Sequence, residues 1–258
     1  MKLARVDEQG DRLIVVNMNA SRRGALSPDL YAAIGDAFEK ARAPGVRAVI
    51  LTSEGGFFCS GGDLNTLIER SKLTEAERKE KIEGLHGVIR AIRSSPVPVI
   101  AAVEGGAAGA GLSIALACDL IVAAEGAKFT AAYVKAGLVP DGGLTSALSR
   151  VMPRPLAMEM CLLAKPVTAE RMEAMGVINA VVPEGQAEAH ANEIADALAR
   201  GPRESQGMIR ALVSSAYEAR EAEQLEAERN AMARAQGGPE AAEGISAFLE
   251  KRKPDFSS

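Results

Sequence analysis

Glycine and alanine are concentrated in one segment of this sequence whose backbone could bind an anion. The segment EGGAAGAGLSIALACD, residues 104–119, places small residues ahead of an apolar run. PVPVIAAV (96–103) precedes it and, being apolar without alternation, predicts a strand buried on both faces. GLSIALACD then predicts a short buried helix. The first amides of a helix lack partners within the helix and carry the positive end of its dipole. They therefore suit an anionic oxygen, including one that forms only during a reaction.

Three other interpretations of the same segment are a membrane span, a nucleotide-binding loop, and close packing without a ligand. From Gly105 to Ala124 the only charge is Asp119, which would be costly in lipid, and the small residues contribute little transfer free energy. Gly105, Gly109 and Gly111 are spaced G-x-x-x-G-x-G, which is not the dinucleotide fingerprint, and no G-K-[ST] follows. Tight packing of a helix against a strand explains the small residues equally well, so packing and an anion site both stay open.

Side chains with acid–base or nucleophilic chemistry lie outside that segment. Asp141 lies in GLVPDGG, where an aspartate before two glycines is most simply a turn residue. His86 lies within 73–93, a predicted helix, and is a candidate base, although a structural role is commoner for such a histidine. Cys59 lies in a second glycine-rich turn, SEGGFFCSGGD (53–63), where packing is its simplest role.

Composition excludes several classes of protein. The 258 residues can bury a large core, and a net charge of −4 leaves no basic surface, so nucleic acid is not an expected partner. The three cysteines are far apart, which favours reduced thiols and a cytoplasmic location. No residues show zinc-ligand spacing, so no metal is expected. The first residues lack the apolar core of a signal peptide, and we expect no membrane association.

Periodicity predicts an α/β core followed by a helical region from about residue 200. Ser27 can cap a helix that begins at Pro28 and runs through residue 43. Beyond Pro153 helical patterns dominate, and the longest is a single run over 204–235. The strand-like segments are 12–18, 46–52, 96–103, 119–131 and 177–183. The other helical segments are 73–93, 155–164, 168–176, 187–200 and 239–252.

Taken in order, these motifs resemble the enoyl-CoA hydratase/isomerase (crotonase) superfamily over nearly the whole chain. The resemblance runs from NASRRGALSPDL through VRAVILTSEGGFFCSGGDL and VPVIAAVEGGAAGAGLSIALACDLIVAA to AGLVPDGGL, KPVTAERMEAMGVINAVVP and AEGISAFLEKRKPDF. It implies a crotonase-like spiral of ββα units over residues 1–200. It also implies a helical trimerisation region over 201–258, with trimers that can pair into hexamers. The substrate it implies is a coenzyme A thioester, with no permanently bound cofactor.

The resemblance also implies a catalytic site. The backbone amides of Gly62 and Ala110 would hold the thioester oxygen as an oxyanion hole. Ser113 and Tyr133 occupy the two positions where hydratases of the family carry glutamates, and neither side chain can replace a glutamate directly. Asp141 matches the acid of family isomerases and the nucleophile of 4-chlorobenzoyl-CoA dehalogenase-like members. Those members also carry a histidine where His86 falls.

Coenzyme A contacts are implied by position in the same way. Arg22 or Arg23 could meet phosphate, and Ala25 lies where the family presents backbone to the adenine–pantetheine bend. The turn that contains Gly62 contributes Ser60, Gly61, Gly62, Asp63 and Leu64. Phe248 and Lys251 match residues that reach the ligand of a neighbouring subunit.

Three functions stay open from the sequence. The first is proton transfer by Asp141 on a thioester enolate, as in an enoyl-CoA isomerase, with an atypical hydratase as its variant. The second is a hydrolytic acyl-CoA reaction, dehalogenase-like or ring-opening, in which Asp141 is the nucleophile and His86 assists. The third is a non-catalytic relative that binds acyl-CoA or RNA, which the missing glutamates suggest and the retained Asp141 argues against.

Overall fold

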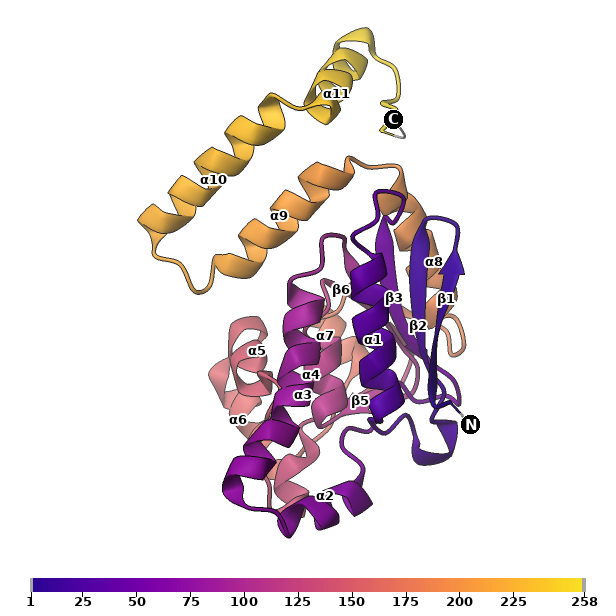
Figure 1. The fold of residues 1–258 in the computed structure, drawn as a ribbon, viewed down its shortest axis with the longest axis vertical. Coiled ribbons are helices and arrows are strands. Elements are labelled where there is room, and N and C mark those ends of the chain that lie inside the picture. The colour runs from indigo at the N-terminus through magenta and orange to yellow at the C-terminus, as the bar shows by residue number, and fades with distance from the viewer. Residues whose placement is uncertain (1, 257–258) are drawn as a thin grey trace.

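A six-stranded sheet forms the centre of the protein, whose computed structural model describes residues 2–256 (Figure 1). Its strand order is β1-β2-β3-β4-β6-β9, with β1 and β2 antiparallel and the remaining neighbours parallel. β2, β3 and β4 are buried almost throughout, which explains why their sequences are apolar without alternation. The strands are β1 (Ala4–Gln9), β2 (Arg12–Asn17), β3 (Ala48–Ser53), β4 (Val99–Val103), β6 (Leu120–Ala124) and β9 (Ala180–Val182).

A smaller sheet lies beside the first and consists of β5 (Gly106–Ala108), β7 (Lys128–Thr130) and β8 (Val167–Thr168). The chain passes from β4 in the large sheet to β5 in the small one, and later from β6 to β7 in the same sense. A helix or helical turn follows each pair. This repeated path is the spiral of ββα units that the resemblance implied, and the prediction of an α/β spiral is confirmed.

Helices cover both faces of the large sheet. α1 (Pro28–Lys40), α3 (Glu75–Arg93) and α4 (Ala110–Ala115) pack on one face with the larger hydrophobic core. α8 (Ala187–Ala199) covers the other face through three alanines spaced four residues apart, which allow its backbone to approach the strands closely. α1 begins as predicted, since the Ser27 side chain accepts a hydrogen bond from the Leu30 amide.

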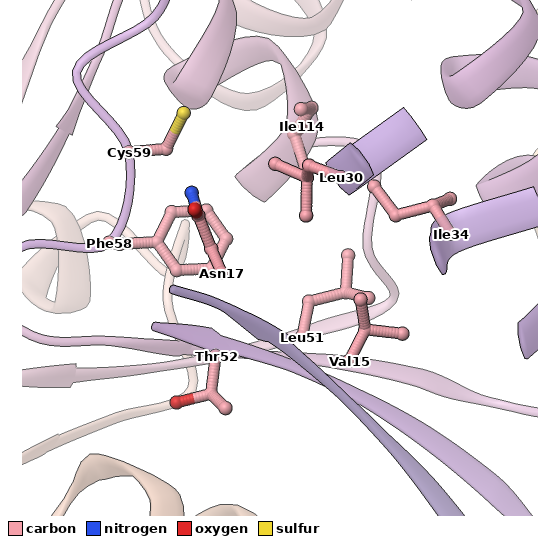
Figure 2. Close-up of a pocket in the computed structure, with 9 residues that line it drawn as sticks. All are labelled: Val15, Asn17, Leu30, Ile34, Leu51, Thr52, Phe58, Cys59 and Ile114. Carbon is pink, nitrogen blue, oxygen red and sulfur yellow. The ribbon is translucent and has the colours of Figure 1, made fainter. Parts of the chain in front are cut away.

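One small cavity lies in the core between β2, β3 and α1 (Figure 2). Its volume of about 20 Å³ leaves room for no more than one water molecule. The polar side chains beside it already have partners, because Asn17 donates to the Gly24 carbonyl and Thr52 donates to Glu188. The cavity is therefore a gap in core packing rather than a ligand site.

The remaining helices include the three at the C-terminal end of the chain. α9, α10 and α11 extend away from the core at one end, and α2 lies at the other end (Figure 1). Among the described residues, no helix is both long and apolar enough to cross a membrane. The bounds are α2 (Leu64–Ser71), η1 (Ala20–Arg22), η2 (Ala132–Ala136), α5 (Leu144–Val151), α6 (Arg154–Leu163), α7 (Ala169–Ala174), α9 (Arg203–Ser215), α10 (Glu221–Gln236) and α11 (Pro239–Glu250).

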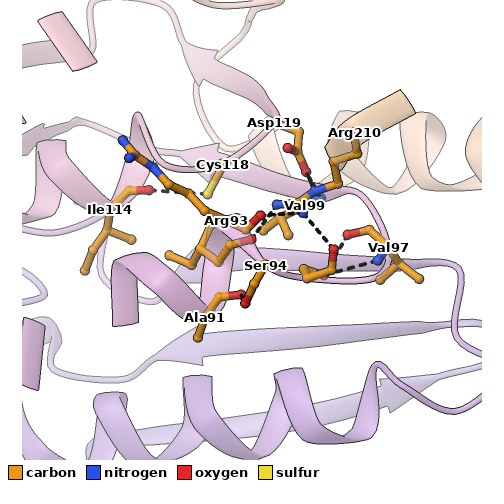
Figure 3. A network of polar contacts seen from close by, with 11 residues as sticks. Ala91, Arg93, Ser94, Val97, Val99, Ile114, Cys118, Asp119 and Arg210 are labelled. Carbon is orange, nitrogen blue, oxygen red and sulfur yellow. Dashed lines mark hydrogen bonds and ion pairs between the residues drawn. The ribbon is translucent and has the colours of Figure 1, made fainter. Parts of the chain in front are cut away.

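A buried arginine anchors α9 to the core (Figure 3). Arg210 donates to the backbone carbonyls of Ile92, Arg93 and Ser95, and its Nε donates to Asp119 Oδ2 at 2.5 Å. Asp119 also accepts a hydrogen bond from the Val99 amide at 2.8 Å. This network joins α9, the end of α3 and the starts of β4 and β6. It also explains the charge that interrupts the apolar window of residues 105–124.

Two element predictions are wrong. The strand-like segment 119–131 is two strands in different sheets, separated by a turn in which Gly126 has φ +71°. The helical run over 204–235 is two helices that pack on each other, with a break at 216–220. No glycine or proline lies at that break. Arg220 and Glu223 start α10 there, since the Glu223 side chain accepts from the Arg220 amide.

Candidate active site

A cleft of about 820 Å³ lies where the glycine-rich turns meet the helices. Its walls come from the start of α1, from α2, from the first half of α3 and from η2. Gly62, Ala110, Tyr133 and Asp141 line it together, although they come from three separate parts of the sequence. The volume is in the range of small-molecule and cofactor sites.

The two glycine-rich turns can meet only because neither carries a side chain at the contact. A Cβ on Gly61, whose φ is +92°, would lie 2.8 Å from the Ala108 carbonyl oxygen. A Cβ on Gly111 would lie 2.3 Å from the Cys59 carbonyl oxygen. The Ala108 amide donates to that same Cys59 carbonyl at 2.8 Å. These glycines therefore serve close packing between the turns.

Two residues of the cleft lining have backbone amides that find no partner among the described residues. Gly62 and Ala110 both line the cleft, and among residues 2–256 nothing accepts a hydrogen bond from either backbone N–H. α4 is only six residues long, so the contribution of its dipole is small and the N–H groups themselves carry the polarity. Gly61 and Gly111 are thus required for packing, whereas Gly62 and Ala110 line the cleft, and the anion site at their amides stays a prediction.

A cluster of three side chains lies beside these amides. The Tyr133 hydroxyl donates to Asp141 Oδ1 at 2.8 Å. The Ser113 hydroxyl donates to the backbone carbonyl of Asp141 at 3.0 Å and lies 3.4 Å from the Tyr133 oxygen. Gly142 has φ +60°, and a Cβ there would lie 3.0 Å from the Ser113 Cβ, so the turn needs glycine at this position. Ser113, Tyr133 and Asp141 are therefore brought together.

The hydrogen bonds assign different roles to the three groups. Burial, reinforced by the Asp141 charge, raises the pKa of Tyr133, so its hydroxyl keeps its proton and acts as a donor. The Ser113 proton is directed at a carbonyl, which leaves Ser113 to hold the turn rather than to act as a base. Among the described residues, none donates a hydrogen bond to Asp141 Oδ2, so this oxygen is available to a ligand.

The other two candidate reactive side chains lie elsewhere. His86 is on α3, half-exposed, with its Nδ1 3.6 Å from Glu83, and it does not line the cleft. Cys59 is buried beside the small core cavity, and burial raises the pKa of its thiol to about 12. A thiol with that pKa is not a nucleophile near neutral pH. Among the described residues, no group of three or more His, Cys, Asp or Glu side chains is arranged to hold a metal ion.

The residues expected at coenzyme A are divided between the cleft and the surface. Ser60, Asp63 and Leu64 line the cleft. Arg22 pairs with Asp63 at 2.6 Å, and the Asp63 carboxylate also caps α2 by accepting from the Thr66 amide, the contact that most lowers its pKa. Arg23 lies over the Phe57 ring at 4.0 Å.

Ala25, Phe248 and Lys251 are not part of the cleft lining. The Ala25 amide donates to the Arg22 carbonyl, and its own carbonyl accepts from Asn19. Phe248 lies on α11 with 83% of its surface exposed, and Lys251 ends that helix. The helix that ends at these residues, α11, lies at the opposite end of the molecule from α2, which lines the cleft (Figure 1).

Several cleft residues were not identified from the sequence, among them two with polar side chains and no hydrogen-bond partner in the described part of the chain. Tyr31 on α1 and Arg70 on α2 line the cleft, and each is half-buried. Their helices are far apart in the chain, so no local motif joins them. The only sequence signal is that each is a polar residue within an amphipathic helix.

The chain matches known proteins over almost its full length. Residues 8–258 match the family model described as enoyl-CoA hydratase/isomerase. A probable enoyl-CoA hydratase of Rhodobacter capsulatus is 39% identical over 96% of this chain and 92% of the relative. A 1,2-epoxyphenylacetyl-CoA isomerase of Escherichia coli is 33% identical over 97% of this chain and 96% of the relative. The crystal structure of an enoyl-CoA hydratase from a Polaromonas species superposes with a TM-score of 0.94 at 39% identity, covering 98% of each chain.

Proposed function

The chain belongs to the enoyl-CoA hydratase/isomerase family, and from that premise we propose that it moves the double bond of an enoyl-CoA with Asp141 as the proton carrier. It is an enzyme that acts on acyl-CoA. The observation that carries the finer proposal is the pairing of Asp141 with Tyr133, beside two unpartnered amides in one cleft. A relative from Escherichia coli is named 1,2-epoxyphenylacetyl-CoA isomerase, so the relatives include an isomerase of an acyl-CoA as well as hydratases.

In the proposed reaction the thioester oxygen accepts hydrogen bonds from the amides of Gly62 and Ala110. Removal of a proton from C2 of a 3-enoyl-CoA places negative charge on this oxygen. Preorganised N–H donors stabilise that charge more strongly than they stabilise the neutral thioester, which lowers the barrier. Stabilisation of the oxyanion itself uses backbone groups only, whereas removal of the proton requires a base.

Asp141 Oδ2 takes the proton from C2 and returns it to C4, which leaves the double bond between C2 and C3. The carboxylate begins and ends in the same ionisation state, so one acid is sufficient. Tyr133 holds Oδ1 and thereby fixes the direction of Oδ2. Ser113 holds the backbone of the same residue.

Hydration and hydrolysis each require side chains that this cleft lacks. Hydration by two acids would need carboxylates at positions 113 and 133, where this chain has serine and tyrosine. Hydrolysis through an aspartyl ester would need His86 near Asp141, and His86 does not line the cleft. Isomerisation is the reaction that uses the groups present.

The test is to incubate the protein with 3-hexenoyl-CoA in deuterated water and to identify the product by mass spectrometry. We expect 2-hexenoyl-CoA that carries deuterium at C2 or C4, because the proton held by Asp141 exchanges with solvent before it is returned. Asp141→Asn keeps the shape and should slow turnover by about 10²–10⁴-fold while acyl-CoA still binds. A 3-hydroxyacyl-CoA or free coenzyme A as the first product would contradict the proposal.

Two controls separate the charge of Asp141 from other effects. Asp36→Asn removes an exposed carboxylate that pairs with Lys40 on α1 and should leave the rate unchanged. Ser113→Ala removes one contact to the Asp141 backbone and should reduce the rate by less than about tenfold, since a neutral hydrogen bond contributes about 1 kcal/mol. A normal rate in Asp141→Asn would reject the role of this carboxylate.

We also propose the assembly and location that the resemblance implied. Residues 1–200 would form the catalytic core, and residues 201–258 would mediate association into trimers or pairs of trimers. Apolar side chains of the C-terminal helices, among them Leu225, Met232, Phe248 and Leu249, are more than half exposed in the single chain, which supports this proposal. Phe248 and Lys251 would then reach the ligand that is bound to a neighbouring subunit. Three free cysteines fit a reducing compartment such as the cytoplasm.

A further inference from the structure

An arginine without a hydrogen-bond partner among the described residues lines the cleft. Arg70 is half-buried near the end of α2, and among the described residues no carboxylate or carbonyl accepts a hydrogen bond from its side chain. The other arginine in the cleft wall, Arg78, already donates to the Leu73 carbonyl. A guanidinium that is partly shielded from water is stabilised most when a planar anion accepts hydrogen bonds from its N–H groups.

Tyr31 provides a second donor near this arginine. Its ring lies on α1 against Gly84 of α3, and its hydroxyl has no hydrogen-bond partner among residues 2–256. Burial raises the pKa of this phenol to about 12, and the positive charge of Arg70 is the next largest influence and opposes the shift. The hydroxyl therefore stays protonated at neutral pH and can donate toward the space it shares with Arg70.

We propose that Arg70 and Tyr31 together bind a second carboxylate at the far end of the acyl group, so that the preferred substrates are coenzyme A thioesters of dicarboxylic acids. The proposal rests on the proposed function, because it assumes that the thioester end is held at Gly62 and Ala110. Arg70 would supply two parallel N–H donors to the carboxylate, and Tyr31 would supply one O–H donor.

The surroundings favour an acid rather than a plain acyl chain at this place. Leu67, Ile82 and Leu85 line the same cleft and offer no polar group to Arg70. An alkyl chain in the cleft would displace water from the guanidinium without replacing its hydrogen bonds, which is unfavourable. A terminal carboxylate would replace them. Asp63, Glu80 and Asp141 also line the cleft; Asp63 pairs with Arg22, and Asp141 accepts a hydrogen bond from Tyr133.

The test compares the binding of glutaryl-CoA and pentanoyl-CoA by calorimetry. The two have the same number of acyl carbons, differ only in the terminal carboxylate, and lack the double bond that an isomerase would move. We expect the wild-type chain to bind glutaryl-CoA at least about tenfold more tightly, as two charge-assisted hydrogen bonds allow. Arg70→Met should abolish this preference and leave the dissociation constant of pentanoyl-CoA within about twofold.

Two further variants locate the effect. Tyr31→Phe removes the hydroxyl alone and should reduce the preference for glutaryl-CoA without abolishing it. Arg42→Met removes an exposed arginine that pairs with Glu39 outside the cleft, and should leave both dissociation constants unchanged.

Each contrary outcome has a separate meaning. Equal binding of both ligands by the wild-type chain overturns the carboxylate site and leaves the proposed function standing. If Arg70→Met weakens both ligands to the same extent, Arg70 contacts coenzyme A and the inference is wrong. If neither ligand binds, the proposed function itself fails.

Discussion

The Tyr133 hydroxyl and the Asp141 carboxylate form a 2.8 Å hydrogen bond between η2 and the turn that precedes α5. The tyrosine is the donor, because burial raises its pKa above the ordinary value and keeps the proton on its oxygen. One carboxylate oxygen is thereby fixed, and the other accepts no hydrogen bond from the described residues. An acid held in this way can move a proton between two carbons without a second acid.

Tyr133→Phe should lower kcat by about tenfold to a hundredfold and leave KM nearly unchanged. Phenylalanine keeps the ring but removes the donor, so the carboxylate loses one constraint on its direction. Steady-state kinetics with the isomerisation substrate measures both constants. An increase in KM with an unchanged kcat would mean that Tyr133 contacts substrate instead of positioning Asp141. Since the pKa of Tyr133 is raised, its ionisation should not reduce the wild-type rate up to about pH 10.

Ala110→Pro should reduce turnover by about 10²–10³-fold, because it removes one of the two amides that face the cleft. Ala110 is the first residue of α4, a position that tolerates proline. Circular dichroism and the binding of free coenzyme A are the controls for the fold. A folded variant with full activity would show that this amide does not hold the oxyanion.

The elements with strong local signals were predictable from the sequence. β2, β3 and β4 are apolar runs, and α1 begins at the Ser27 cap, so both kinds of element follow from neighbouring residues. β1 was missed because its sequence ARVDEQ is largely polar and pairs at the edge of the sheet. The break before α10 was missed because tertiary packing of α10 on α9, rather than a glycine or proline, determines it.

The site was predictable only through the resemblance. Ser113, Tyr133 and Asp141 are 20 and 8 residues apart and share no local pattern, so their contact depends on the path of the chain through both sheets. Tyr31 and Arg70 could not be identified in the same way, since they come from separate helices. The glycines were recognisable as a group, but only the three-dimensional contacts distinguish those that pack from those that present an amide.

Gly111→Ala should destabilise the protein by at least about 2 kcal/mol, because the added methyl group would overlap the Cys59 backbone and cannot be relieved by a side-chain movement. Gly35→Ala is the matched control. Gly35 lies inside α1 with nothing within 4 Å of an added Cβ, so alanine there should stabilise by about 0.5–1 kcal/mol. Urea denaturation at one protein concentration compares the two. Equal stability of the two variants would show that the turns do not approach as closely as described.

Arg210→Met should destabilise the protein by about 3–5 kcal/mol. The substitution leaves Asp119 without its buried counter-charge and the carbonyls of Ile92, Arg93 and Ser95 without their donor. Arg229→Met is the control on the neighbouring helix. The Arg229 side chain is 73% exposed whereas that of Arg210 is 6% exposed, so loss of its pair with Glu226 should cost less than about 1 kcal/mol.

A double variant tests whether the destabilisation by Arg210→Met comes from the Asp119 carboxylate, which this substitution leaves without a counter-charge. Combining Arg210→Met with Asp119→Asn removes the uncompensated charge, so the double variant should be less destabilised than the sum of the two single variants. Denaturation of all four proteins at one concentration gives the coupling free energy. Additive effects would mean that Arg210 acts through the three carbonyls alone, and that the ion pair contributes nothing to holding α9 against the core.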